Sequence, residues 1–439
     1  MDKNTLWYSL NRVRGLLDQQ TILDLTIYAL FLRKSEIDGL NARKEQYSLS
    51  WLSVGYGDPI SVAELTNYMR DIETEYGVQD GIVSESFYNI ALRITDSSKV
   101  KDIFRAVNNI DLSSDKILMA VYDEIIDQYV LSTGYSIAQH GSGRMIAKLE
   151  GALLNAEHGT EIYDGFCGFG ISASEAGDET NSYYIRDIVR DVLAKAIITM
   201  IIHDRKNLQA FCGDSNMYNE RKYRYAICEP PFGIRKDNEY IDRIRAYHDI
   251  VCNNSVDVEM IIGSLEEDGR AVILVPAGML FSGGKMTDFR SYIVGRRGEN
   301  DNYVEAVVSL PSGVIPGSGV STALLVIDKG RKSDKIVMVN SESFWEGKKG
   351  RELTLSDDKI IELKDIVLSG KAVEAVSAVV TVDEIAEKDM NMTPQIYVNP
   401  YKIEEAKVTD LKELYAKEKS LMQKLSEVNS ALTTIREIN

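Results

Sequence analysis

Short apolar runs alternate with helical stretches from about residue 161 onward, and this alternation limits what the chain can fold into. The apolar runs are 161–164, 182–187, 208–214, 223–232 and 270–276, and helical stretches at 188–204 and 255–269 separate some of them. Such alternation is typical of β-α-β units, in which neighbouring strands are parallel. We therefore predict an α/β fold with a doubly wound parallel sheet.

Two further apolar runs, at 304–311 and 321–330, have no helical stretch between them. The glycine-rich segment 312–320 joins them instead. Strands that follow one another without a crossover helix pair in antiparallel fashion. We expect this pair to form an antiparallel edge of the sheet, with its long loop near the active face.

The two ends of the chain have a different pattern. Segments 17–34 and 115–131 carry apolar residues at helical spacing, which predicts an all-helical N-terminal domain over 1–130 before the main domain at 131–400. In 401–439, apolar residues recur in steps of three and four, interrupted at Glu418: Leu411, Leu414, Leu421, Leu425, Val428, Leu432 and Ile435. We interpret this heptad helix as a partner-docking coiled coil; the alternative is a helix folded back on its own core.

Composition and charge restrict the classes of function. The formal net charge of −17 opposes binding to bare nucleic acid, so a nucleic-acid role needs a local basic surface or a basic partner. The four cysteines have no C-x-x-C spacing and the four histidines are scattered, which predicts neither a disulfide framework nor a zinc site. The N-terminus has no signal pattern and no window reaches 18 uninterrupted apolar residues, so we expect a soluble, cytoplasmic protein.

A glycine-rich turn follows the first predicted strand of the sheet. Asp164 ends that strand, and Gly165, Gly168 and Gly170 follow, where a flexible backbone can pass close to a ligand. Asp187 ends the next strand, at the distance where an acid can bind the hydroxyls of a ribose. The pattern also fits the fingerprint of a nicotinamide-dinucleotide dehydrogenase, or a tight turn without a ligand.

A third acid, Asp214, stands at the end of a third predicted strand. The carboxyl ends of parallel strands form the rim where open α/β sheets bind ligands. Three acids in consecutive units at that rim indicate a nucleoside-containing cofactor.

The fourth predicted strand ends in Glu229, Pro230, Pro231 and Phe232. The two prolines fix the local φ angles and remove two backbone donors, so nearby carbonyl groups can act as acceptors. Acceptors beside a flat aromatic ring suit a planar, amino-bearing ring such as an adenine flipped out of a duplex. The alternative interpretation is a plain Pro-Pro turn.

The order of these motifs resembles that of the adenine-N6 DNA methyltransferases, and more narrowly the modification (HsdM-type) subunits of type I restriction–modification systems. The resemblance covers residues 139–398 and rests on "DGFCGFG", "YYIRDI", "FCGDSN", "EPPF" and later segments such as "GRAVILVPAGMLFSGG" and "EIAEKDMNMTPQIYV". It implies a Rossmann-like methyltransferase sheet that transfers a methyl group from S-adenosyl-L-methionine to adenine N6 in DNA. We expect catalysis to need no metal, since no cluster of hard ligands stands out in the sequence.

The resemblance also implies roles for individual residues. Asp187 would hold the cofactor ribose and Asp214 the cofactor adenine. Glu229 and the Pro230 carbonyl would bind the target amine, and Phe232 would stack on the base. The remaining cofactor-binding candidates are Ser142, Asp164, Phe166, Cys167, Gly168 and Gly170.

The resemblance further implies partners. These are DNA, a DNA-specificity subunit, a restriction subunit and a second copy of the chain. Basic residues that could contact phosphates are Arg221, Lys222, Arg224, Arg235, Lys236, Arg296 and Arg297; the alternative is that these charges form a solvated surface.

Two positions depart from the family pattern. Glu229 stands where the family has Asn or Asp, and Ser142 with Gly143 stands where it has Thr-Pro. One extra methylene moves an acceptor by roughly 1.5 Å on a fixed backbone. These departures leave a second hypothesis open, a catalytically impaired subunit that binds or regulates in a DNA-modification or defence complex.

Overall fold

The computed structural model describes most of the 439-residue chain and divides it into two units, Met1–Val398 and Asn399–Asn439. The described residues are 17–40, 48–49, 61–78, 80–94, 98–112, 114–132, 143–217, 221–234, 236–246, 248–296, 302–315, 318–347, 353–398 and 417–428. Within these ranges, no helix has the length and apolar character needed to cross a membrane.

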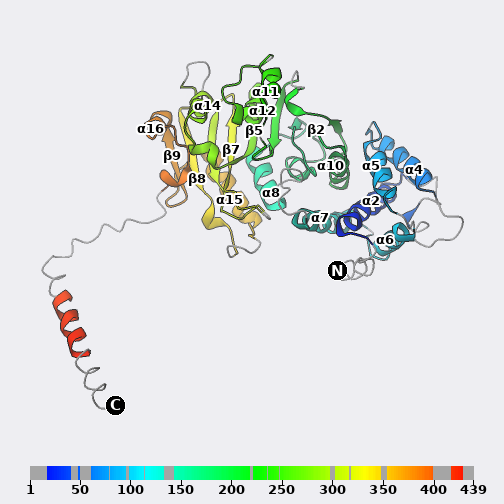
Figure 1. The fold of residues 1–439 in the computed structure, drawn as a ribbon, viewed down its shortest axis with the longest axis horizontal. Helices are drawn as coiled ribbons and strands as arrows, with labels where there is room; N and C mark the ends of the chain where they lie inside the picture. The colour runs from blue at the N-terminus through cyan, green and yellow to red at the C-terminus, as the bar shows by residue number, and fades with distance from the viewer. Residues whose placement is uncertain are drawn as a thin grey trace, which may run out of the picture. The chain divides into compact units, whose positions relative to one another are not determined.

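A nine-stranded sheet forms the centre of the first unit, in the order β3-β2-β1-β4-β5-β7-β6-β8-β9 (Figure 1). Strands β3, β2, β1, β4 and β5 are parallel to one another, whereas β7 runs antiparallel to β5 and β6. The strands are β1 Glu161–Asp164, β2 Ser182–Asp187, β3 Leu208–Cys212, β4 Tyr223–Cys228, β5 Leu265–Pro276, β6 Val304–Ser309, β7 Thr322–Asp328, β8 Lys335–Asn340 and β9 Ser377–Thr381. The predicted fold class, a doubly wound sheet with an antiparallel edge, is confirmed.

The antiparallel side of the sheet extends beyond the predicted pair. Strand β8 pairs in parallel with β6, and β9 closes the edge antiparallel to β8. The sequence analysis did not name these two strands.

One predicted helix boundary is wrong. Helix α12 (Val256–Gly263) ends before 265–269, and those residues begin strand β5. Leu265 pairs with Tyr223, whereas the next pair joins Tyr225 to Arg270, so the polar residues between Leu265 and Arg270 bulge out of the ladder and are mostly exposed. The bulge explains why a polar segment that resembles a helix end belongs to a strand.

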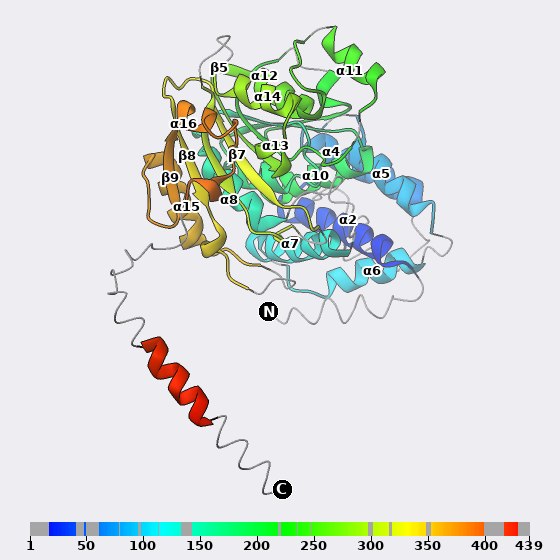
Figure 2. The ribbon, with the colours of Figure 1, turned by 60° about the vertical axis from the view of Figure 1, so that its left-hand side comes forward.

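Helices cover both faces of the sheet, as a doubly wound fold requires. Alternate residues of β5 enter different cores: Val272 packs in the core that includes α8, α10 and α15, and Ile273 packs in the core that includes α12 and α14. Figure 2 shows α12 and α14 on one side of the sheet, with α8 and α15 on the other. The helices of this region are α8 Arg144–Leu154, α9 Ile171–Glu175, α10 Arg190–Ile202, α11 Asn238–Arg245, α13 Gly278–Phe281, α14 Lys285–Ile293, α15 Asp357–Ser369 and α16 Val382–Ala386.

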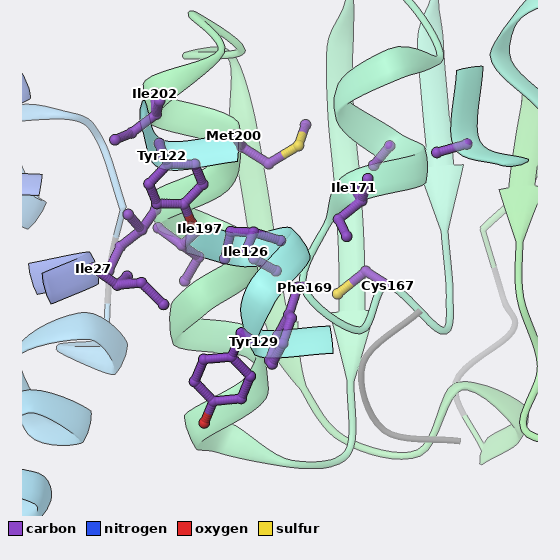
Figure 3. Packing of buried hydrophobic residues seen from close by; sticks show 14 of the residues in the cluster. Ile27, Tyr122, Ile126, Tyr129, Cys167, Phe169, Ile171, Ile197, Met200 and Ile202 are labelled. Carbon is purple, nitrogen blue, oxygen red and sulfur yellow. The ribbon is translucent and has the colours of Figure 1, made fainter. Parts of the chain in front are cut away.

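The N-terminal part of the first unit is helical, as the sequence predicts, and shares a core with α10. Figure 3 shows Ile27, Tyr122 and Ile126 of this part among the side chains around Ile197. The helices are α2 Gln19–Ile37, α4 Val62–Glu75, α5 Ile82–Ala91, α6 Ser98–Asn108 and α7 Asp115–Ser132. The domain boundary near residue 130 stays a prediction.

The second unit is described only over 417–428, which form a helix. Leu421, Leu425 and Val428 are each more than half exposed there, so the described part of the heptad stripe faces solvent. The other predicted stripe positions, Leu411, Leu414, Leu432 and Ile435, lie outside the described residues. The role of this helix in docking a partner stays a prediction.

Candidate active site

The acids predicted from the sequence gather at one edge of the sheet. Asp164 ends β1 and Asp187 ends the parallel neighbour β2, while Asp214 follows β3 by two residues. Strand β4 is the other parallel neighbour of β1 and leads into Glu229. Because the carboxyl ends of parallel strands meet at one edge, the glycine turn and the Glu229 turn share this rim.

Asp187 is fixed by the backbone of the turns around it. Its Oδ2 accepts a hydrogen bond from the Gly168 backbone N–H at 3.1 Å, and its Oδ1 accepts one from the Val189 N–H at 2.8 Å. Burial raises the pKa of the Asp187 carboxyl to about 6, although both hydrogen bonds act to lower it. A carboxylate offers about four acceptor positions, so Asp187 keeps lone pairs for hydroxyl groups of a ligand.

Asp164 lies deeper than Asp187 and is almost fully buried. Its Oδ1 accepts a hydrogen bond from the Phe166 N–H at 3.1 Å, which shapes the start of the glycine turn. Burial raises the pKa of the Asp164 carboxyl well above its usual range, and the nearby carboxyls of Glu229 and Asp187 add to that rise.

The glycine turn has a left-handed backbone and an apolar anchor. Gly168 and Gly170 have φ angles of +52° and +75°, and a Cβ on Gly170 would lie 3.1 Å from the backbone of Ala196 in α10. Phe169 is buried between them and packs edge-on against Tyr129 of α7 at a centroid distance of 4.9 Å (Figure 3). The helix that follows, α9, is only five residues long.

Asp214 belongs to a separate polar cluster on the same rim. Its Oδ1 accepts hydrogen bonds from the Asn216 N–H at 3.0 Å and from the Tyr240 hydroxyl at 3.2 Å. Buried Asn216 in turn donates through Nδ2 to Tyr240 at 2.9 Å and also to Asp257. The Oδ1 of Asn216 has no hydrogen-bond partner among the described residues, so this cluster has an acceptor to offer a ligand.

The predicted catalytic turn continues from β4 and is tied to α9. The Ser172 hydroxyl donates to Glu229 Oε1 at 2.6 Å, so one oxygen of the Glu229 carboxyl has a fixed neighbour. Pro230 is buried, and Pro231 and Phe232 are half-buried. The turn therefore combines a stiff backbone with a positioned acceptor and a partly accessible ring.

A further carboxyl, which the sequence analysis missed, lies behind this turn. Glu150 of α8 is fully buried, and neither of its carboxyl oxygens has a hydrogen-bond partner among the described residues. Burial raises the pKa of Glu150 well above its usual range, and the neighbouring Glu229 carboxyl raises it further. Glu150 stands in the apolar stripe of the helical run 144–154, and this polar residue among apolar positions is the local signal that could have indicated it.

Comparison with known proteins decides the family. The model of the N-6 DNA methylase family matches residues 113–406, well over half of the chain. The chain belongs to this family.

Individual relatives agree with the family assignment. The type I restriction enzyme MpnII methylase subunit of Mycoplasma pneumoniae is 25% identical over 385 residues, covering 76% of this chain and 70% of the relative. The type I restriction enzyme MjaVIII methylase subunit of Methanocaldococcus jannaschii is 27% identical over 304 residues, covering 62% of this chain and 51% of the relative. The chain therefore spans about half the length of the second relative.

A solved structure shows the same fold. The methyltransferase subunit of a type I restriction–modification system from Streptococcus thermophilus superposes with a TM-score of 0.74 at 16% sequence identity. The match covers 90% of this chain and 99% of that one. Membership in the N-6 DNA methylase family favours the methyltransferase interpretation of the glycine turn over the dehydrogenase interpretation.

Exposed apolar side chains at the rim were also missed by sequence reasoning. Ile188 and Val189 follow Asp187 and are 67% and 40% exposed, and Phe211 at the end of β3 is 39% exposed. An apolar surface beside a carboxylate that can bind hydroxyls suits a nucleoside, which has a flat ring and a ribose. Two apolar residues directly after a strand-ending acid are the signal that could have indicated them.

The described residues among those predicted to contact phosphates do not form a free basic surface. Arg221 pairs with Glu161, Arg224 with Asp268, Lys236 with Asp257 and Arg296 with Asp383, and the Lys222 ammonium donates to the Gly263 carbonyl. Arg235, Arg297 and the cofactor candidate Ser142 lie outside the described residues.

Over the described ranges, no three His, Cys, Asp or Glu side chains are grouped so that they could hold a metal ion.

Proposed function

We propose that this protein transfers a methyl group from S-adenosyl-L-methionine to adenine N6 in DNA, as the modification subunit of a type I-like complex. The observation that carries the proposal is the shared rim of β2, β1 and β4. It brings the fixed carboxyl of Asp187 and the Ser172-bound carboxyl of Glu229 to the same edge of the sheet.

The proposed cofactor site uses acceptors on one side and apolar surface on the other. Asp187 would bind the ribose hydroxyls through its remaining lone pairs, with Ile188 and Val189 against the flat ring. Asp214 and Asn216 would bind the cofactor adenine. The methionine side would meet Ser142, Asp164, Phe166, Cys167 and the glycine turn. The cofactor, when bound, supplies an electrophilic methyl group.

The proposed base site is the turn after β4. Glu229 Oε2 and the Pro230 carbonyl would accept the two hydrogens of the target amine, since Glu229 Oε1 already accepts from Ser172. As positive charge develops on the amine, such acceptors bind its hydrogens more strongly. They therefore stabilise the transition state more than the ground state. Pro231 would keep the turn stiff, and Phe232 would stack on the flipped base.

The proposed partners follow from the family and from the charge. The relatives are named as subunits of type I restriction enzymes. A chain with a net charge of −17, whose described basic residues near the turn are paired, gains a DNA surface from a partner. We therefore include a DNA-specificity subunit, with a restriction subunit and a second copy of the chain as further members. The exposed helix at 417–428 is the proposed docking segment.

A second candidate function rests on one observation. Glu229 stands in place of the Asn or Asp of the family turn, and a shift of about 1 Å in a reacting group can cost on the order of 100-fold in rate. The alternative is a methyltransferase-fold protein that binds cofactor and partners in a DNA-modification or defence complex without transferring methyl groups.

The deciding assay uses the complex purified from its own host through a tag on this chain. Labelled S-adenosyl-L-methionine and DNA from a strain lacking the gene are the substrates. Label recovered as N6-methyladenine supports the enzyme. A complex that binds the cofactor but leaves the DNA unlabelled supports the second candidate.

A further inference from the structure

The carboxyl of Glu150 lies in a place where an acid is costly. The side chain is 0% exposed, and neither oxygen has a hydrogen-bond partner among the described residues. Burying an ionised carboxylate without partners costs many kcal/mol, so such a group takes up a proton instead. Helices α8 and α9 pack closely next to it, because a Cβ on the adjacent Gly151 would lie 2.2 Å from the Glu175 carbonyl oxygen of α9.

In the hydrogen bond that joins Ser172 to Glu229, both polar neighbours of Glu150 are left with acceptor positions for it. The Ser172 hydroxyl and the Glu229 carboxyl are both close enough to affect its titration. The single hydrogen of Ser172 is donated to Glu229 Oε1 at 2.6 Å, so Ser172 has only lone pairs left for Glu150. A neutral carboxylic acid at Glu150 could donate a hydrogen bond to the Ser172 oxygen or to the Glu229 carboxyl. An ionised Glu150 would instead place a third acceptor beside these two.

Other charged groups around α8 do not change this conclusion. Asp164 and the Cys228 thiol lie nearby, and neither is a cation. The Asp164 carboxyl contributes to the raised pKa of Glu150, and the carboxyls of this cluster contribute to the raised pKa of the Cys228 thiol. The cations on adjoining elements have other partners: Arg144 pairs with Asp123 and Glu175, Lys148 with Asp357, and Arg270 with Glu305 and the Leu153 carbonyl.

We propose that Glu150 is a positioning residue that stays protonated at neutral pH and shares its proton with Glu229 and Ser172. A protonated Glu150 would hold one oxygen of the Glu229 carboxyl from behind, and the other oxygen would face the target amine. A neutral Glu150 adds no second charge beside Glu229, which allows a glutamate to serve at this turn. The role in positioning rests on the proposed methyl transfer, whereas the shared proton does not.

The first test measures the proton without using activity. The infrared difference spectrum of the wild-type chain minus Glu150→Gln at pH 8 should contain the carbonyl band of one protonated carboxylic acid. The unfolding equilibrium of the wild-type chain should also shift toward unfolding by about tenfold per pH unit relative to Glu150→Gln, as pH rises above the ordinary glutamate range. Glu157→Gln, at an exposed position just after α8, is the control and should leave both signals unchanged.

The second test measures positioning in the complex. Glu150→Gln keeps a donor and should retain methyl transfer within about threefold, with a flatter pH profile; Glu150→Leu removes the donor and should lower kcat by about tenfold or more, at an unchanged cofactor Kd. A difference spectrum of wild type minus Glu150→Gln without that band would overturn the proposal. Full kcat in Glu150→Leu would overturn the positioning role. If the wild-type complex transfers no methyl group, the infrared test still decides the shared proton, so failure of the proposed function is recognised separately.

Discussion

The Ser172 hydroxyl of α9 donates to Glu229 Oε1 at the end of β4, across 2.6 Å and 57 positions of sequence. This hydrogen bond joins the helix after the glycine turn to the proposed base-binding turn. The proposed cofactor side of the rim and the proposed acceptor for the target amine are therefore in direct contact through these two side chains.

Ser172→Ala should lower methyl transfer by about 10-fold to 100-fold, because a hydrogen bond to a charged group contributes about 1.5–3 kcal/mol. The cofactor Kd should stay within about twofold, since the hydroxyl touches the turn and not the Asp187 side of the rim. Ser174→Ala is the control: it lies on the same helix and its hydroxyl bonds to the Ile171 carbonyl. Equal losses in both variants would mean that the effect is one of helix stability.

Glu229→Asn tests whether the longer side chain is adapted to this site. The account predicts a loss of about tenfold or more in kcat, because Asn is too short to keep the Ser172 bond and carries no charge. Steady-state kinetics of the complex measure this change, with Glu229→Gln as the variant of equal length. A rise in kcat for Glu229→Asn would show that the glutamate is a defect and would support the impaired subunit.

Cofactor binding should depend on pH through Asp187, whose pKa is raised to about 6 by burial. The ionised carboxylate is the stronger acceptor for ribose hydroxyls, so affinity should be full above pH 7 and fall by up to about tenfold per pH unit below 6. Titration calorimetry with S-adenosyl-L-methionine between pH 5 and 8 measures this slope. Asp187→Asn should weaken binding at pH 8 and remove the slope; a wild-type affinity that does not change over this range would exclude the proposed contact.

The glycine turn should depend on its apolar anchor in the helical part. Phe169 is 1% exposed and packs against Tyr129, so Phe169→Ala should lower the free energy of unfolding by about 3–5 kcal/mol. Chemical denaturation of the full chain measures this change. Phe281→Ala removes the same group from a position that is 54% exposed, and its cost should stay below about 1 kcal/mol. Similar losses in the two variants would contradict the anchoring role.

The sequence predicts the parallel half of this fold because its strands are short apolar runs that end in acids or glycines. Asp164 and Asp187 stand at the ends of β1 and β2 as expected, since strand ends carry the ligand-binding turns in this architecture. Strand β5 was misjudged at its start because the polar residues of a bulge have the composition of a helix end.

The missed site residues share a physical reason. Glu150 and Ser172 reach Glu229 only because α8 and α9 pack beside the end of β4, and that contact has no local pattern in the sequence. Helix period predicts which side of α8 is buried, and a glutamate on that side contradicts the pattern. A polar residue in an apolar stripe is the signal that could have marked Glu150.

Single-molecule sequencing for N6-methyladenine in the DNA of the native host, with and without this gene, tests the proposed function most directly. The cell supplies the partners that the chain needs, so the result does not depend on whether the purified subunit is active by itself. The account predicts that deletion removes methylation from one defined sequence motif and that the intact gene restores it, whereas Glu229→Asn restores it only in part. An unchanged methylation pattern after deletion of an expressed gene would contradict the methyltransferase and favour the binding subunit.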